Sequence, residues 1–344
     1  MSRLFRIISL LLGLFVLFAS AFAQETIKVD TTLVSIPVIV SERNGRYVPG
    51  LKEKDFTLYQ DGVKQTIGFF AATEEPLNVA LMLDTSLSTA PVLKDIQHAA
   101  KDFIKQLRPQ DRAMIVSFDH NVQVISQFTS ARHTLENAIE EAQIGKRAGT
   151  VMRDALWQVI EQNFKPLKGR KAIVLLTDGK DHGSQMEAPE LLKKTAEVDV
   201  LIYSVFYLSH PLKLADNAPS LPRGGMGGIR MGRRGGVFGP RFPPAPRPDR
   251  EARREQRRQK IEARNEPAKE FLQELAEGSA GRYYRSETTN LKKTFELIAE
   301  ELRHQYRLGF YPPEDGNAGK LHKLKVEVAK ADVVVRARHD YRKQ

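Results

Sequence analysis

Hydroxyl and carboxyl side chains stand at three places in this chain where a buried strand is expected to end or a helix to begin. The first place is the segment 84–88, which follows the apolar run 79–83. The second is Thr150, which precedes a helical pattern, and the third is Asp178, which follows the apolar run 172–176. Loops at the carboxyl ends of parallel strands gather in one crevice of an α/β sheet, where ligands bind, so we expect these side chains to lie close together.

The chemistry of these side chains indicates a site for a divalent cation. Two carboxylates and three hydroxyls are all hard oxygen donors, which suit Mg²⁺, with Mn²⁺ or Ca²⁺ as alternatives. The formal charge of such a site with its ion is near zero, so a further anion, such as a carboxylate of another molecule, can join it at little electrostatic cost. The five predicted metal ligands are Asp84, Ser86, Ser88, Thr150 and Asp178.

The order of these residues resembles the metal-ion-dependent adhesion site (MIDAS) of von Willebrand factor A-type (VWA) domains. That site combines Asp-x-Ser-x-Ser, a later Thr in a Gly-containing loop, and an Asp in a Thr-Asp-Gly turn, and the resemblance covers roughly residues 76–305. It implies that the hydroxyls of Ser86, Ser88 and Thr150 contact the ion. It also implies that Asp84 and Asp178 hold the ion directly or through water. Many members have two glycines before the Thr, whereas here the first of them is Ala148.

Each segment also has a purely structural interpretation. Ser86 and Ser88 would then cap a helix that begins near Pro91. Thr150 would be an N-cap residue, and Thr-Asp-Gly would be an ordinary turn at a strand end. The joint occurrence of all three segments favours the metal site. The nearby acids Asp154 and Asp181 are interpreted as surface or supporting residues rather than ligands.

Alternating strand and helix patterns between Leu77 and Gln305 predict an α/β fold with a doubly wound, mostly parallel sheet covered on both faces. The flanks, residues 24–75 and 306–344, have the sequence pattern of β-strands. Each flank has too few strands to form a hydrophobic core of its own. We therefore expect them to form one small β-sandwich, into which the VWA domain, residues 76–305, is inserted. This layout resembles bacterial secreted VWFA-related domain proteins.

The N-terminus has the pattern of a signal peptide. Arg3 and Arg6 precede the apolar stretch 7–18, and Ala21-Phe22-Ala23 fits a small-x-small cleavage site, so residues 1–23 are predicted to be removed. The protein is then exported to the periplasm or the extracellular space. The alternative is an uncleaved anchor, for which the apolar stretch is short. The chain has no cysteine, which excludes disulfides, thiol catalysis and lipid attachment through a cysteine.

The net charge of +11 is concentrated in one segment. Residues 209–264 hold fourteen Lys and Arg against five Asp and Glu, a net charge of +9. The Gly-, Pro- and Arg-rich insertion 209–265 is expected to be disordered, although residues 249–264 can form a helix without an apolar stripe. It either attracts an anionic envelope polymer or is a passive insertion. Export argues against nucleic acid as its partner.

These features predict a non-enzymatic, divalent-metal-dependent protein-binding or adhesion module of an exported bacterial protein. Its partner would supply a carboxylate to the metal. One alternative is a structural envelope protein with an unused metal site. Another is a haloacid-dehalogenase-like phosphatase with Asp84 as nucleophile, but Ser86 stands where that class needs its second acid. The chain has neither a P-loop nor a Gly-x-Ser-x-Gly elbow, and its histidines show no ligand spacing.

Overall fold

The computed structural model describes residues 33–43, 45–72, 75–208, 250–286, 290–313 and 319–342. The predicted signal peptide, residues 1–23, lies outside these residues. The largest unit is a six-stranded sheet of order β10-β9-β8-β5-β6-β7, in which every neighbouring pair is parallel except β6 with β7. Its strands are β5 (Leu77–Asp84), β6 (Arg112–Phe118), β7 (Val122–Thr129), β8 (Arg170–Thr177), β9 (Leu201–Tyr207) and β10 (Arg282–Ser286).

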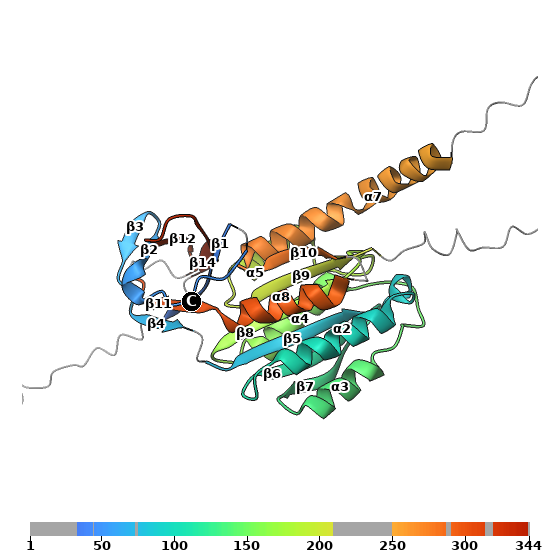
Figure 1. Ribbon diagram of the computed structural model, residues 1–344, viewed down its shortest axis with the longest axis horizontal. Coiled ribbons are helices and arrows are strands. Elements are labelled where there is room, and N and C mark those ends of the chain that lie inside the picture. The colour runs from blue at the N-terminus through green and yellow to red at the C-terminus, as the bar shows by residue number, and fades with distance from the viewer. Residues whose placement is uncertain are drawn as a thin grey trace, which may run out of the picture.

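Helices cover both faces of this sheet, as the alternating pattern predicts (Figure 1). One face carries α2 (Leu93–Gln106), α3 (Arg132–Glu141) and α8 (Leu291–Arg303). The other carries α4 (Met152–Val159), α5 (Ala188–Ala196) and α7 (Arg250–Gly278). Single turns lie at η2 (Glu53–Asp55), η3 (Leu87–Thr89) and η4 (Ile160–Phe164).

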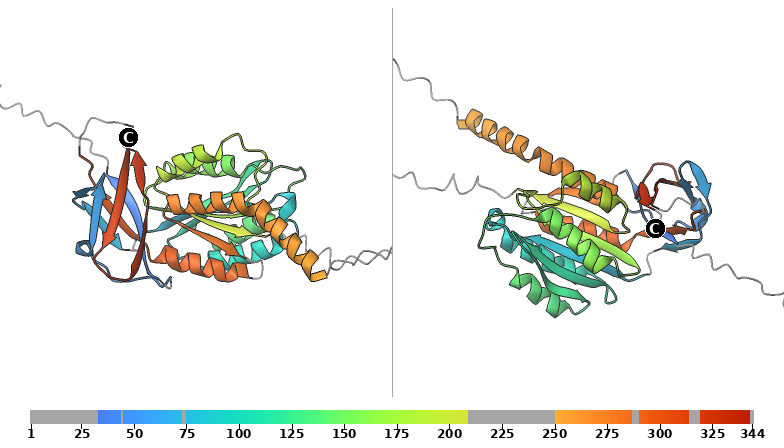
Figure 2. Two further views of the ribbon diagram at one scale, coloured as in Figure 1. Left: turned by 90° about the horizontal axis from the view of Figure 1, so that it is seen from above. Right: turned by 180° about the vertical axis from the view of Figure 1, so that it is seen from behind.

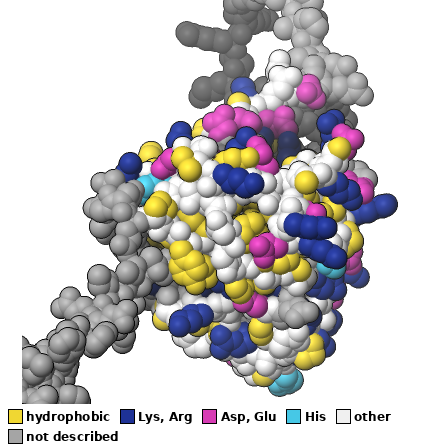
Figure 3. Space-filling model, turned by 90° about the vertical axis from the view of Figure 1, so that its left-hand side faces the viewer, with side chains coloured by type: hydrophobic (Ala, Val, Ile, Leu, Met, Phe, Trp, Pro, Cys, Tyr) yellow, Lys and Arg dark blue, Asp and Glu magenta, His cyan; other side chains and the backbone are white. Residues whose placement is uncertain are grey.

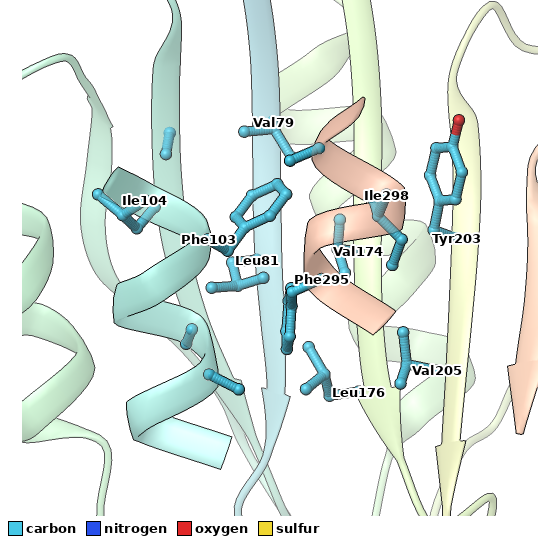
Figure 4. Close-up of a cluster of buried hydrophobic side chains, with 14 of the residues drawn as sticks. Val79, Leu81, Phe103, Ile104, Val174, Leu176, Tyr203, Val205, Phe295 and Ile298 are labelled. Carbon is cyan, nitrogen blue, oxygen red and sulfur yellow. The ribbon is translucent and has the colours of Figure 1, made fainter. Parts of the chain in front are cut away.

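The central strand β5 is buried along its whole length because both of its faces are covered. Leu81 belongs to the cluster under α2 and α8, and Met82 to the cluster on the opposite face. Phe103 of α2 and Phe295 of α8 meet over the sheet with ring centroids 5.4 Å apart (Figure 4). This apolar packing holds the end of β5, and therefore the predicted metal site, in a fixed place.

The two flanks of the chain combine into a β-sandwich, which confirms the predicted fold class. One sheet has the order β13-β1-β11-β4 and the other β14-β12-β2-β3, so each contains strands from both ends of the chain. The N-terminal strands are β1 (Val34–Glu42), β2 (Phe56–Gln60), β3 (Val63–Gln65) and β4 (Phe69–Ala72). The C-terminal strands are β11 (Tyr306–Phe310), β12 (Leu321–Val328), β13 (Val333–Ala337) and β14 (Asp340–Arg342).

The sandwich sits at the end of the molecule where the strands of the six-stranded sheet begin (Figures 1 and 2). The buried Arg170, at the start of β8, contacts both chain segments that connect the sandwich to the six-stranded sheet, near residues 75 and 305. Its guanidinium donates to Gln305 Oε1 at 3.0 Å, to the carbonyl of Glu75 at 3.2 Å and to the carbonyl of Leu302. The strand ends that carry the predicted metal ligands therefore lie at the edge away from the sandwich.

The exposed end of the sandwich shows positive, negative and hydrophobic side chains interspersed, without a large patch of one sign (Figure 3). The basic character of the chain is therefore not displayed on this face. None of the described helices is long and apolar enough to cross a membrane.

Helix α7 begins inside the predicted insertion, residues 209–265. Residues 250–265 are helical, in agreement with the expectation that 249–264 can form a helix, so the expected disorder does not extend over this part of the insertion. Residues 209–249 lie outside the described part of the chain. The C-terminal half of α7 is anchored by Leu272 and Leu275, which are buried, while its N-terminal half extends beyond the body of the molecule (Figure 1).

Candidate metal site

Asp84 ends strand β5 and is fully buried. Its Oδ1 accepts a hydrogen bond from the backbone N–H of Ser86 at 2.9 Å, and its Oδ2 accepts one from the hydroxyl of Thr177 at 2.8 Å. The hydroxyl of Thr177 in turn accepts from the backbone N–H of Gly179 at 2.9 Å. The carboxylate of Asp84 is thus tied both to the loop that follows it and to the Thr-Asp-Gly turn at the end of β8.

Burial raises the pKa of Asp84 to about 6, and the negative charge of Asp178 adds to this effect. Hydrogen bonds from Ser86 and Thr177 act in the opposite direction. The pKa of the Tyr207 hydroxyl, at the end of β9, is raised as well. Burial is the main cause, and the negative charges of Asp84 and Asp178 add to it. Two acidic groups therefore share a poorly solvated region, and a divalent cation would relieve their repulsion.

Ser86 and Ser88 present their hydroxyls to each other, with the Oγ atoms 3.1 Å apart. Ser86 precedes the short helix η3, but its side chain makes no capping hydrogen bond there. Helix α2 begins only at Leu93, with Val92 at its N-cap position. The structural interpretation of these serines as helix caps is therefore wrong.

Thr150 lies in the loop before α4 and is buried. Its carbonyl accepts from the backbone N–H groups of His182 at 3.1 Å and Gly183 at 3.0 Å, which joins this loop to the one that follows Asp178. Its hydroxyl makes no hydrogen bond within the described parts of the chain, and Val151 rather than Thr150 is the N-cap residue of α4. Gly149 has φ +128°, a conformation that L side chains rarely adopt.

Asp178 follows β8 and is also buried, with 3% of its side chain exposed. One of its carboxylate oxygens contacts the ammonium group of Lys180, and the other accepts from the backbone N–H of Lys180 at 3.3 Å. A positive charge thus already sits against this carboxylate. The ammonium group therefore offsets part of the negative charge of this carboxylate.

The two nearby acids support the loops. Asp154 accepts hydrogen bonds from the backbone N–H groups of Gln185 at 2.8 Å and Met186 at 2.9 Å. Asp181 accepts from the backbone N–H of Arg153 at 2.9 Å and from the hydroxyl of Ser184 at 2.7 Å. Both carboxylates are engaged in fixing the loop after Asp178 against α4.

A further acid beside the site, Asp119, was missed from the sequence. It follows β6, its carbonyl accepts from the N–H of Val151 at 2.7 Å, and its Oδ1 lies 2.7 Å from Nδ1 of His120. A Cβ atom at Gly145 would collide with the Asp119 carboxylate, so a larger residue there would require the Asp119 side chain to move. The rule that selected Asp84 and Asp178, an acid directly after an apolar strand, would also have selected Asp119.

The donor set fits a hard divalent ion. Asp84 is linked by hydrogen bonds to both the serine loop and the Thr-Asp-Gly turn, and the carbonyl of Thr150 is linked to the loop that follows this turn. Among the described residues, no three His, Asp or Glu side chains are grouped as metal ligands, so hydroxyls would have to complete the coordination. The sequence-predicted residues provide those hydroxyls.

Part of the six-stranded sheet, from β5 to β8, matches a known protein family. Residues 79–180 match the family model described as von Willebrand factor type A domain. No curated protein matches the chain.

Several solved structures resemble the fold. BatB, a conserved hypothetical protein from Bacteroides thetaiotaomicron, is 21% identical, with 66% of this chain and 97% of that chain covered and a TM-score of 0.43. The vWF domain of the type V pili tip protein Mfa5 from Porphyromonas gingivalis is 13% identical, with 66% and 94% covered and a TM-score of 0.40. Proximal thread matrix protein 1 from the mussel byssus, with zinc in its MIDAS motif, is 13% identical, with 70% and 49% covered and a TM-score of 0.46.

Proposed function

We propose that this chain, which contains a von Willebrand factor type A domain, is a non-enzymatic module that binds a partner protein through a divalent metal ion. The observation that carries the proposal is the buried Asp84 carboxylate, bonded to Ser86 on one side and Thr177 on the other. This arrangement draws together the loops that bear the predicted ligands.

In this proposal Asp84, Ser86, Ser88, Thr150 and Asp178 hold one Mg²⁺, with Mn²⁺ or Ca²⁺ as alternatives. The bound ion supplies a Lewis-acid position that accepts a carboxylate oxygen of the partner. The protein's own residues fix the ion and limit access to it, because four of the five are buried and only Ser88 is partly exposed.

A binding role agrees with the family, whose domains generally act as interaction modules rather than enzymes. It also agrees with the local chemistry, since the acids next to the predicted ligands, Asp154 and Asp181, are occupied by backbone hydrogen bonds. We further propose that the protein acts as an adhesion module after export, in the periplasm or outside the cell, as its N-terminal residues predict.

A pull-down from bacterial envelope extract tests this function. The mature chain, residues 24–344, is used as bait in Mg²⁺ and again in EDTA, and a partner should be retained only with Mg²⁺. Asp178→Ala should abolish retention while circular dichroism shows an unchanged fold. Glu296→Ala removes an exposed acid of α8 and serves as a matched control that keeps binding. Equal retention with and without EDTA would contradict the proposal.

A further inference from the structure

We propose that a groove between the Thr-Asp-Gly turn and helix α7 receives an acidic peptide segment of the partner, adjacent to the metal. This inference rests on the proposed function, because the metal would hold the first acid of the peptide. It goes further in assigning the neighbouring surface, the residues that line it and the chemistry of the segment that it accepts.

The groove is a cavity of about 340 Å³ bounded by two of the loops that present predicted metal ligands. Met152 and Arg153 lie just after Thr150, and Gly179 and Lys180 lie just after Asp178. The opposite wall is the part of α7 between residues 264 and 271. A ligand in this groove would therefore lie between α7 and the two loops that carry Thr150 and Asp178.

Helix α7 is held firmly against the turn. Gly179 has φ +76°, and a Cβ atom there would come 2.7 Å from Cβ of Ala268 and 3.3 Å from the ring of Phe206. Only glycine fits this close approach. The position of α7 is consequently coupled to the turn that carries Asp178, and the groove has one rigid wall.

The lining combines an apolar floor with charged side chains at the rim, where the acid Asp181 pairs with Arg153. Met152 is buried, and Ala268 and Phe271 are partly buried, so they offer apolar surface at the bottom of the cavity. At the rim, Arg153 is occupied, since its Nε donates to the carbonyl of Met186 at 2.7 Å. Lys180 is paired with Asp178.

Arg264 differs from these two cations. Its side chain is exposed at the rim of the groove and forms no ion pair with any residue of the described ranges. From Arg264 the helix continues outward from the body of the molecule (Figure 2). One turn further out, the basic residue Lys260 is exposed. Arg264 is therefore available to pair with an acidic group of a ligand.

The proposed metal, the apolar floor and the exposed Arg264 together define which ligand the groove can bind. A partner segment with one acid on the metal, an apolar side chain over Met152 and Phe271, and a second acid against Arg264 would match the groove in charge and polarity. A simple polyanion would match only the charge of the rim and would use neither the apolar floor nor the metal. The groove therefore favours a peptide with an apolar residue between two acids.

The test uses the mature chain and fluorescein-labelled peptides that carry Glu, then Leu, then a second Glu two to four residues after the first. Matched peptides replace the second Glu by Gln. Fluorescence anisotropy in Mg²⁺ should show that Arg264→Glu weakens binding of the best two-acid peptide by about tenfold, and of its Gln counterpart by less than about twofold. Lys64→Glu makes the same charge change on exposed strand β3 and should have little effect on either peptide.

Calorimetry with Mg²⁺ alone separates the two proposals. If Mg²⁺ binds but no peptide binds, or if Arg264→Glu affects both peptides equally, the groove is not the peptide site and the metal-binding function still stands. If Mg²⁺ does not bind, the proposed function fails and this inference fails with it. Binding of polyglutamate that is as strong in EDTA as in Mg²⁺ would show a polyanion surface and would also overturn the inference.

Discussion

The ammonium group of Lys180 contacts a carboxylate oxygen of Asp178, two residues earlier in the Thr-Asp-Gly turn. Asp178 is buried, whereas 32% of the Lys180 side chain is exposed, so the positive group reaches the acid from the solvent side. A divalent ion that binds at the proposed site would have to compete with this lysine. The pair therefore sets part of the affinity for the metal.

Replacing Lys180 with Met should strengthen Mg²⁺ binding by about fivefold, which corresponds to a partly exposed ion pair of about 1 kcal/mol. Calorimetric titration of both proteins with Mg²⁺ measures the change. Lys180→Arg keeps the charge and should bind Mg²⁺ much as the unmodified protein does. Weaker binding by the Met variant would show that Lys180 supports the site rather than competes with the ion.

Tyr306 links the start of β11 to the N-terminal part of the sandwich. Its buried hydroxyl donates to the carbonyl of Val48 at 2.8 Å and accepts from the N–H of Leu51 at 3.1 Å. Tyr306→Phe should lower the free energy of unfolding by about 1–2 kcal/mol, because both backbone groups lose a partner. Urea denaturation measures this, and Tyr311→Phe, at a residue that is 55% exposed, is the control with little change. Equal effects of the two substitutions would contradict this role.

His304 should make stability depend on pH. Its ring stacks on Tyr47 with centroids 4.5 Å apart, and burial, followed by the charge of Arg303, lowers its pKa below the ordinary 6.5. The unfolded chain then binds a proton more readily than the folded one. The stability that the neutral His304 ring contributes is fully present above pH 6.5, the pKa of the unfolded state. It is lost as the pH falls from 6.5 through the lower pKa of the folded state.

His304→Phe retains an aromatic ring and removes this titration. The difference in unfolding free energy between pH 7.5 and pH 5.5 should be smaller in the variant than in the unmodified protein. Urea denaturation at the two pH values gives that difference. An identical pH dependence in both proteins would show that His304 is equally solvated in the folded and unfolded states.

Deleting residues 219–264 and bridging the gap with a short Gly/Ser linker should leave thermal stability nearly unchanged. Within the described residues, this part of α7 is mostly exposed, and its ion pair between Glu262 and Arg285 lies at the surface. Adsorption to anionic vesicles should weaken, and in the full-length protein it should fade as the salt concentration rises. A deletion that unfolds the protein would show that the segment is structural.

The sequence was most informative where one physical rule dominated. The unbroken apolar run before Asp84 predicted a strand covered on both faces, and β5 is such a strand. The shortage of strands in each flank predicted a shared sandwich. The sequence alone could not predict that β1 would lie between β11 and β13, because the order of the strands depends on side-chain packing across the two sheets.

Helix α7 shows where local rules fail. Residues 249–264 have no apolar stripe, and Pro267 argues against a continuous helix through that position. The helix nevertheless runs from Arg250 to Gly278, because its second half is anchored on the sheet by residues such as Leu272. In the candidate site, the spacing of residues identified the loops, whereas the contact of Lys180 with Asp178 depends on how side chains fold back in three dimensions.

The central claim is that the five predicted ligands bind one divalent ion, and calorimetric titration of the mature protein with Mg²⁺ tests it most directly. We expect one bound Mg²⁺ per chain, with weak affinity because solvent or a partner must complete the coordination. Asp178→Ala should remove this binding without unfolding the protein. Absence of Mg²⁺ binding in the folded, unmodified protein, or unchanged binding in Asp178→Ala, would contradict the account.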